Sequence, residues 1–156
     1  MKLASLYYQS LRSSGLVALA RRVRRGGMVL CYHNVVSDID ALRAPAGGLH
    51  MPRATFERQM RWLARHYTIV ALDELVERIE RGRPLRSVAA ITFDDGYAGV
   101  LDCAWPLLRD LRILATVFVV ADAPDRAEEF WWDHPAVVEA QSDGRRRNAP
   151  LSRLLS

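Results

Sequence analysis

The chain has little cysteine and no long apolar run, and each of these absences excludes some classes of protein. Only two of its 156 residues are cysteines, Cys31 and Cys103, and they lie far apart without a C-x-x-C spacing. A disulfide framework or a cysteine zinc knuckle is therefore not expected, and both cysteines are predicted to be small core residues in a reducing compartment. No apolar run approaches the roughly 20 residues that a membrane-spanning helix needs.

Acidic residues are missing from the first 37 residues. The six basic residues there are Lys2, Arg12, Arg21, Arg22, Arg24 and Arg25. Residues 1–27 are predicted to form a basic amphipathic leader helix, which could lie on an anionic membrane surface, although a solvated terminal helix is the favoured interpretation. Because Gln9, Ser10 and Arg12 interrupt the apolar core of a secretory signal, we expect a cytoplasmic location, with peripheral contact at the inner face of the membrane as an alternative.

Hydrophobic periodicity predicts strands that alternate with helices from residue 28 onward. With 50% hydrophobic and 26% charged residues, the chain has the composition and length of about one globular domain. Strands are expected at 28–36, 67–71, 87–93 and 113–121, and helices at 55–66, 73–81 and 98–111. The strands are almost wholly apolar, which favours an α/β fold whose parallel sheet is covered on both faces. Pro106 is expected to kink the last helix or to lie in its first turn.

The first two predicted helices carry start and stop signals. Thr55 is expected to cap the first of them. Asp73 opens the second, Glu77 pairs with Arg81 four residues later, and Gly82 closes it. The residues expected to face the core are Phe56, Met60 and Leu63 in the first helix and Leu75, Val76 and Ile79 in the second.

The stretch "ITFDDGY" places two carboxylates, Asp94 and Asp95, at the end of a predicted buried strand. Neighbouring strand residues point to opposite faces, so the two could share a target only where the strand ends and Gly96 lets the backbone turn. The carboxyl ends of parallel strands form the edge where α/β proteins bind ligands. Two adjacent carboxylates could bind a metal ion, or one could bind a ligand while the other transfers protons. The alternative interpretation is an ordinary polar Asp-Gly turn without a function of this kind.

The same stretch resembles the first motif of the polysaccharide deacetylases with a NodB homology domain. Around it, "MVLCYHNVV" resembles the leading strand of that family, and "TFERQMRWLARHYTIVALDELVERIERGRPL" resembles the helix, strand and helix that come next. "AWPLLRDLRILATVFVV" resembles the crossover after the motif. The resemblance runs from about Met28 to Trp132 in the order of the family, so residues 28–156 are interpreted as a partial deacetylase domain.

The resemblance implies a metal-dependent hydrolase on a distorted (β/α) barrel with parallel strands and outer helices, incomplete at its carboxyl end. Such an enzyme removes N-acetyl, or in a variant O-acetyl, groups from a polysaccharide. By analogy Asp94 would be the general base and Asp95 a ligand of a divalent metal, most often zinc. This assignment agrees with the chemistry of amide hydrolysis, which needs a proton acceptor and a polarised carbonyl.

The sequence departs from the family in the second motif, His-Ser/Thr-x-x-His-Pro, which should supply two histidine ligands. "DHP" at 133–135 matches only its end, because the residue four positions before His134 is Phe130. The later motifs are also missing, and a barrel of this kind takes about 250 residues. The chain is therefore expected to be a truncated, amino-terminal part of a deacetylase, in which one carboxylate cannot complete a catalytic zinc site with three protein ligands.

Two further residues are candidates for substrate contact. His33 follows the first strand and should lie on the same rim as the acidic pair, where it would contact substrate or metal or act as a structural, hydrogen-bonded histidine. Tyr97 would contact substrate or pack at the start of a helix. The other histidines are expected to be a loop residue (His50), a residue at a helix C-terminus (His66) and a structural residue (His134).

The aromatic cluster Phe130, Trp131 and Trp132 could stack on a sugar, but core packing is the favoured interpretation because such rings bury a large area.

Two other classes of function stay open. A receiver-type phosphoacceptor domain would use Asp122 as a third acid, but it also needs a late lysine, and the only lysine is Lys2. An inactive fragment or interaction module of the same family would expose a sheet edge and could self-associate. Nucleic-acid binding is not expected, because the arginines gather in a terminal segment that contains no recognisable nucleic-acid-binding motif.

Overall fold

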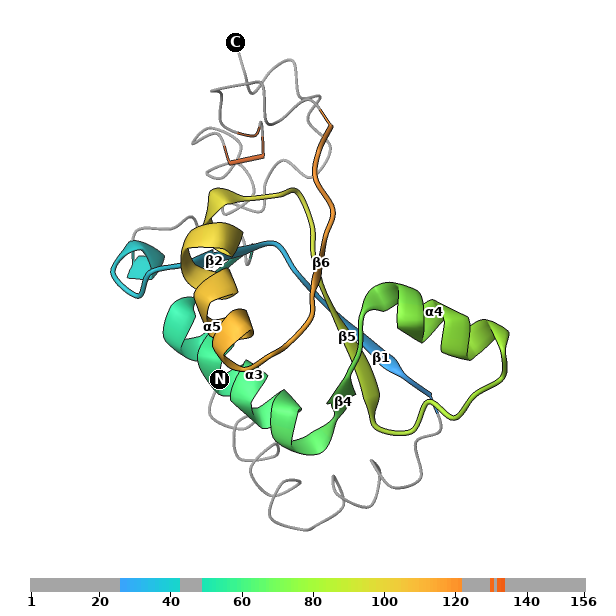
Figure 1. Cartoon of the computed structure of the whole chain (residues 1–156). Coiled ribbons are helices and arrows are strands. Elements are labelled where there is room, and N and C mark those ends of the chain that lie inside the picture. Colours follow the sequence, from blue (N-terminus) through green and yellow to red (C-terminus); the bar gives the residue numbers. More distant parts are fainter. Residues whose placement is uncertain (1–25, 43–48, 122–129, 131, 134–156) are drawn as a thin grey trace, which may run out of the picture.

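The computed structural model describes residues 26–42, 49–121, 130, 132 and 133, which form an α/β arrangement (Figure 1). The leader helix predicted for 1–27 falls almost wholly outside these residues. In chain order the elements are β1 (Met28–Tyr32), β2 (Asn34–Val36), the 3-10 helix η1 (Asp40–Leu42), β3 (His50–Pro52), α3 (Arg53–His66), β4 (Thr68–Ile69), α4 (Leu72–Glu80), β5 (Val88–Phe93), the π-helix η2 (Val100–Ala104), α5 (Trp105–Asp110) and β6 (Thr116–Val117). In this part of the chain no helix has the length and apolarity needed to cross a bilayer.

Strand β5 is the centre of the main sheet. Along one edge it pairs in parallel with all of β1, from Met28 beside Ala89 to Tyr32 beside Phe93. Its other edge is shared, because β4 pairs with the beginning of β5 and β6 with its end. Every residue of β5 is buried, which confirms the prediction of a parallel sheet covered on both faces.

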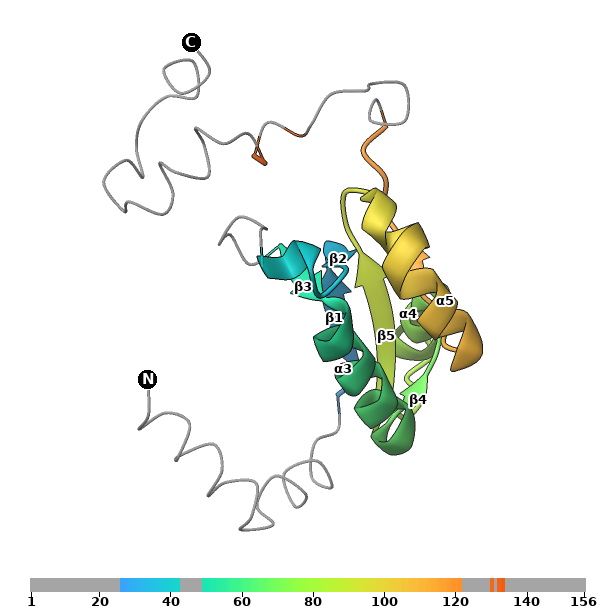
Figure 2. The same cartoon turned by 90° about the vertical axis from the view of Figure 1, so that its left-hand side faces the viewer.

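Two strands are shorter than predicted, because each has only part of an edge to pair with. Strand β4 covers two of the residues expected at 67–71, and β6 covers two of those expected at 113–121. Because β4 and β6 share one edge of β5, neither strand can pair along the full length of that edge. Val119 and Val120 lie beyond the paired residues of β6. The strand predicted at 28–36 is divided at His33, after which β2 leaves the main sheet and pairs in parallel with β3 (Figure 2).

Helices cover both faces of β5: Figure 1 shows α3 and α5 on one side and α4 on the other. Ile91 and Phe93 pack in the larger cluster with residues of α3 and α5. Val88 and Ala90 pack with Leu75 of α4 in a smaller cluster. The larger cluster includes Phe56, Met60 and Leu63, as predicted for α3.

The prediction for α4 was wrong at two of three positions. Leu75 is buried, but Val76 and Ile79 are 45% and 57% exposed. The cluster that α4 forms with β5 uses Leu75 and the partly buried Leu72 of the helix against Val88 and the small Ala90, so Val76 and Ile79 lie outside it.

The termini of the helices also differ in part from prediction. Thr55 does not cap α3, which begins two residues earlier after Pro52, and its hydroxyl oxygen instead accepts a hydrogen bond from Arg58 at 3.0 Å. The ion pair between Glu77 and Arg81 is confirmed at 2.9 Å. Gly82 closes α4 with a positive φ of 62°, and Pro106 lies in the first turn of α5, directly after the π-helix.

Replacing Phe56 by alanine should destabilise the fold strongly. Phe56 is fully buried, and its ring lies edge-on against Tyr32, with 5.2 Å between centroids, and tilted against Phe93. Truncating such a ring costs about 3–5 kcal/mol, measured as the free energy of unfolding in urea. The control, Ile39→Ala, removes a side chain that is 69% exposed and should change stability by less than about 0.5 kcal/mol. Equal losses in the two variants would contradict this core.

Candidate functional site

The acidic pair lies at the carboxyl end of β5, on the rim that β5 shares with β1. The register places Tyr32 beside Phe93, so the residues after each strand, His33 and Asp94, emerge on the same side of the sheet. The backbone N–H of Asp94 donates to the carbonyl oxygen of Tyr32 at 2.8 Å, which extends the pairing by one residue. The sheet therefore fixes the backbone of Asp94 before the chain turns away.

The turn that follows uses two left-handed residues in succession. Asp95 has a φ of 70° and Gly96 a φ of 73°. Glycine adopts this conformation at no steric cost, and aspartate tolerates it better than most residues, although at some cost. A side chain at position 96 would also approach Val119, since an added Cβ would lie 3.0 Å from that side chain. Both observations explain why glycine follows the acids.

Asp94 has a partner that the sequence did not indicate. Its Oδ2 accepts a hydrogen bond from the thiol of Cys31 on β1 at 3.2 Å. Partial desolvation of the sulfur, and then the hydrogen bond to Asp94, raise the pKa of this thiol, which is therefore a donor and not a thiolate at neutral pH. The prediction that Cys31 is a core residue was wrong: it is exposed, because along β1 it lies on the opposite face from the buried Tyr32. Cys103 is half-buried against the larger cluster.

The second acid, Asp95, lies in a less favourable environment for a charge. Partial burial raises its pKa above the ordinary value, and the negative charges of Asp94 and Asp133 raise it further. His33 acts in the opposite direction, so it lies near enough to favour the ionised form. The structure thus brings His33 and the acidic pair together, whereas their roles stay predictions.

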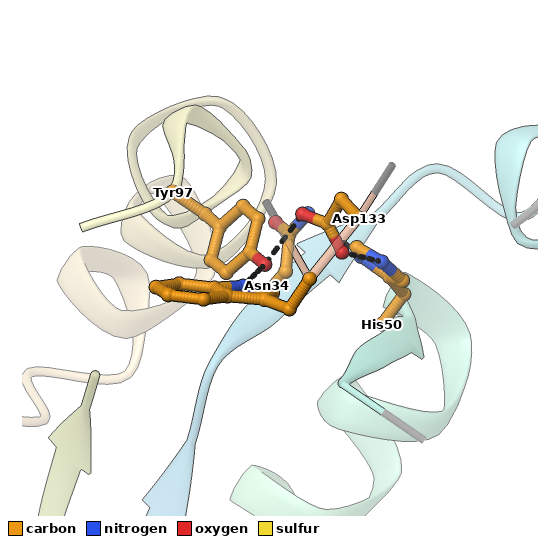
Figure 3. Close-up of polar contacts among 5 residues, drawn as sticks. Asn34, His50, Tyr97 and Asp133 are labelled. Atoms are coloured by element: carbon orange, nitrogen blue, oxygen red, sulfur yellow. Dashed lines mark hydrogen bonds and ion pairs between the residues drawn. The ribbon is translucent and has the colours of Figure 1, made fainter. Parts of the chain in front are cut away.

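Tyr97 was predicted to contact substrate or to pack at the start of a helix, but its hydroxyl also takes part in a series of hydrogen bonds, shown in Figure 3. Its hydroxyl donates to Oδ2 of Asp133 at 2.6 Å and accepts from the indole nitrogen of Trp132 at 2.8 Å. Burial, followed by the hydrogen bond to Asp133, raises the pKa of Tyr97 well above its ordinary value. Since the hydroxyl proton is committed to Asp133, a substrate contact by Tyr97 would use its ring.

The aromatic cluster packs on this tyrosine. The ring of Phe130 lies edge-on to Tyr97, with 5.0 Å between centroids, and stacks on Trp132 at 4.8 Å. Phe130 and Trp132 are partly buried, which agrees with the packing interpretation. Trp131, His134 and Asp122 lie outside the described residues.

Sequence reasoning missed two residues of this region. His50 belongs to β3, not to a loop; its Nε2 lies 3.4 Å from Oδ1 of Asp133, and its Nδ1 lies 3.1 Å from the side-chain nitrogen of Asn34. The only sequence signal for Asp133 is an acid within "FWWDHP", which an ordinary turn would also explain. His66 meets its prediction, because its Nδ1 lies 2.7 Å from the carbonyl oxygen of Trp62 in the last turn of α3.

The described residues do not fit a complete zinc site. Among them, no group of three or more His, Cys, Asp or Glu side chains could hold a metal ion. A catalytic zinc ion uses three protein ligands and keeps a fourth position for water or substrate. The rim therefore offers carboxylate donors to a cation without completing its coordination.

Comparisons with known proteins point to one family. A family model described as polysaccharide deacetylase matches residues 81–144, which include the acidic pair. YxkH of Bacillus subtilis, named as a proposed polysaccharide deacetylase, is 28% identical over 94 residues, which are 59% of this chain and 31% of that protein. The chain thus spans about a third of the length of this curated relative.

Solved structures show the same fold at low sequence identity. IcaB of Ammonifex degensii is 24% identical with a TM-score of 0.56, over 76% of this chain and 50% of that one. The deacetylase PplD of Streptococcus pyogenes, in complex with acetate, is 17% identical with a TM-score of 0.55, over 78% and 53%. A de-N-acetylase of Aggregatibacter actinomycetemcomitans is 23% identical with a TM-score of 0.51, over 72% and 41%.

Removing the charge of Asp95 should stabilise the chain at neutral pH. A raised pKa means that the folded state binds this proton more tightly than the unfolded state, so the stability it contributes at low pH is lost as the pH rises through the folded pKa. Asp95→Asn, which tolerates a positive φ equally well, should raise the unfolding midpoint at pH 7 and leave it nearly unchanged near pH 3. Urea unfolding at both pH values measures this. Asp110→Asn, at an exposed position, is the control, and a lower midpoint for Asp95→Asn at pH 7 would contradict the account.

Proposed function

We propose that this chain belongs to the polysaccharide deacetylase family and carries the catalytic rim of a hydrolase that removes N-acetyl or O-acetyl groups from a polysaccharide. The observation that carries the proposal is the placement of Asp94 and Asp95 directly after β5, within the residues that match the family. Ligands of α/β proteins bind at this edge. The names of the relatives, which include a de-N-acetylase, support the N-acetyl group as the target.

Asp94 is proposed as the general base. Hydrolysis of an acetamide requires a group that takes a proton from the attacking water, and a carboxylate within hydrogen-bond reach can do so. The backbone N–H···O bond to Tyr32 holds Asp94 at the strand end, and the Cys31 thiol holds Oδ2. We assign Oδ1 to the water.

Asp95 is proposed as one ligand of a divalent ion, with zinc as the ion that the resemblance implies. Such an ion, when bound, would polarise the acetyl carbonyl. The described residues supply too few ligands to complete its site, so no step is assigned to it. His33 and the ring of Tyr97 are proposed as substrate contacts, since both lie beside Asp95.

The finer architecture is proposed to be a partial, distorted (β/α) barrel. Parallel strands, outer helices and the similarity in fold to deacetylases support this proposal. The strand order β1-β5-β4 differs from a regular barrel, in which consecutive strands are neighbours. Self-association through the edge at β6, where Val117 and Phe118 are 42% and 50% exposed, remains a second proposal. Membrane contact through residues 1–25 and the cytoplasmic location stay predictions.

Replacing Asp94 by asparagine should remove deacetylation. The full chain would be incubated with N-acetylglucosamine oligomers and a divalent metal, and the released acetate would be measured. Because asparagine cannot accept the proton, the rate should fall roughly 100-fold or more. The control, Asp110→Asn, alters an exposed acid of α5 and should retain the wild-type rate.

The assay separates the proposal from its alternatives. Wild-type rates in Asp94→Asn would overturn the assignment of the base. Absence of acetate with the wild-type chain would overturn activity of this chain alone and favour a non-catalytic module of the family.

A further inference from the structure

Side chains from four separate parts of the chain meet in one polar network beside the rim. Asn34 comes from β2, His50 from β3, Tyr97 from the segment after β5, and Asp133 from a region 36 residues beyond Tyr97 (Figure 3). The side chains of His50 and Asp133 are only 11% and 18% exposed. A carboxylate in such a position needs partners, because an unpaired buried charge is costly.

The chemistry of the donors fixes the direction of the bonds at Tyr97. An indole nitrogen only donates, so Trp132 uses a lone pair of the Tyr97 oxygen. The single hydroxyl proton then goes to Oδ2 of Asp133, in a short bond of 2.6 Å typical of a charged acceptor. Asp133 therefore determines how the Tyr97 hydroxyl is oriented.

The other oxygen of Asp133 faces His50. Nδ1 of His50 lies 3.1 Å from the Asn34 side-chain nitrogen, which only donates, so Nδ1 is the acceptor. In the neutral ring the proton then lies on Nε2, which is 3.4 Å from Oδ1 of Asp133. The arrangement holds the imidazole in one tautomer and aims its N–H at the carboxylate.

The fold leaves space for this arrangement at Gly99. A Cβ there would collide with Oδ1 of Asn34 and the carbonyl oxygen of Val35. Oδ1 of Asn34 is also buried and has no hydrogen-bond partner among the described residues. The amide of Asn34 therefore makes its contact in this network through its nitrogen, which faces His50.

We infer that Asp133 is a positioning residue: its carboxylate holds Tyr97 and His50 in fixed orientations. The structural part of this inference stands on the hydrogen bonds alone, and its catalytic consequence rests on the proposed function. Asp133 itself does not touch the reacting atoms. Its effect reaches the rim through Tyr97, which directly follows Gly96 in the chain.

The test compares two variants of the full chain by NMR. Asp133→Ala removes both bonds of the carboxylate, and Tyr97→Phe removes only the hydroxyl while keeping the packed ring. Both should shift the indole N–H signal of Trp132 and the backbone amide signals of residues 94–96. Asp133→Ala should also shift the ring nitrogens of His50. The control, Asp110→Ala, should leave all of these signals in place.

The acetate assay adds a readout that a purely structural role would not change. Asp133→Ala should lower kcat about tenfold to a hundredfold, with KM within about twofold, because misplaced groups slow the chemical step more than they weaken binding. Asp133→Asn keeps an acceptor for Tyr97 and should recover part of the loss.

Each outcome has one meaning. Wild-type signals at residues 94–96 in both variants would overturn the inference, and so would an unchanged kcat in Asp133→Ala. If Asp133→Ala unfolds, Tyr97→Phe decides through the same signals. If the wild-type chain releases no acetate, the proposed function fails while the NMR comparison still tests the network.

Discussion

Parallel pairing between β1 and β5 is the contact on which the rest of this structure depends. It covers one edge of the central strand from Ala89 to Phe93 and brings the ends of both strands to one rim. Cys31 thereby reaches Asp94, and His33 comes near Asp95, although more than 60 residues separate the two segments. Without this pairing, the acids would be an ordinary Asp-Gly turn, and no rim would exist on which to place them.

The central strand, the helices around it and the position of the acidic pair could be predicted from the sequence, because each follows from local patterns. The apolar run of β5 and the spacing of Phe56, Met60 and Leu63 indicated burial directly. The lengths of β4 and β6 could not be predicted, because they depend on how two strands divide one edge of β5. The exposure of Ile79 likewise depends on how much of the sheet α4 covers.

The polar network could not be predicted from the sequence for a similar reason. His50 and Asp133 are 83 residues apart, and neither lies in a sequence motif that would predict a contact with the other. Cys31 looked like a core residue because it lies in an apolar strand, yet its face of β1 is exposed. Family resemblance assigned roles only to residues inside its motifs, so the neighbours that orient those residues came from the tertiary structure.

The most direct test of the central claim, that the carboxyl end of β5 is the site where this chain binds a cation and acts, is paramagnetic line broadening by Mn²⁺. Backbone amide signals of the full chain would be followed during a titration with the metal alone. The account predicts the strongest broadening at Asp94, Asp95 and Gly96, with His33 next. Broadening centred on the exposed acids of α4, or signals at residues 94–96 that persist while others vanish, would contradict it.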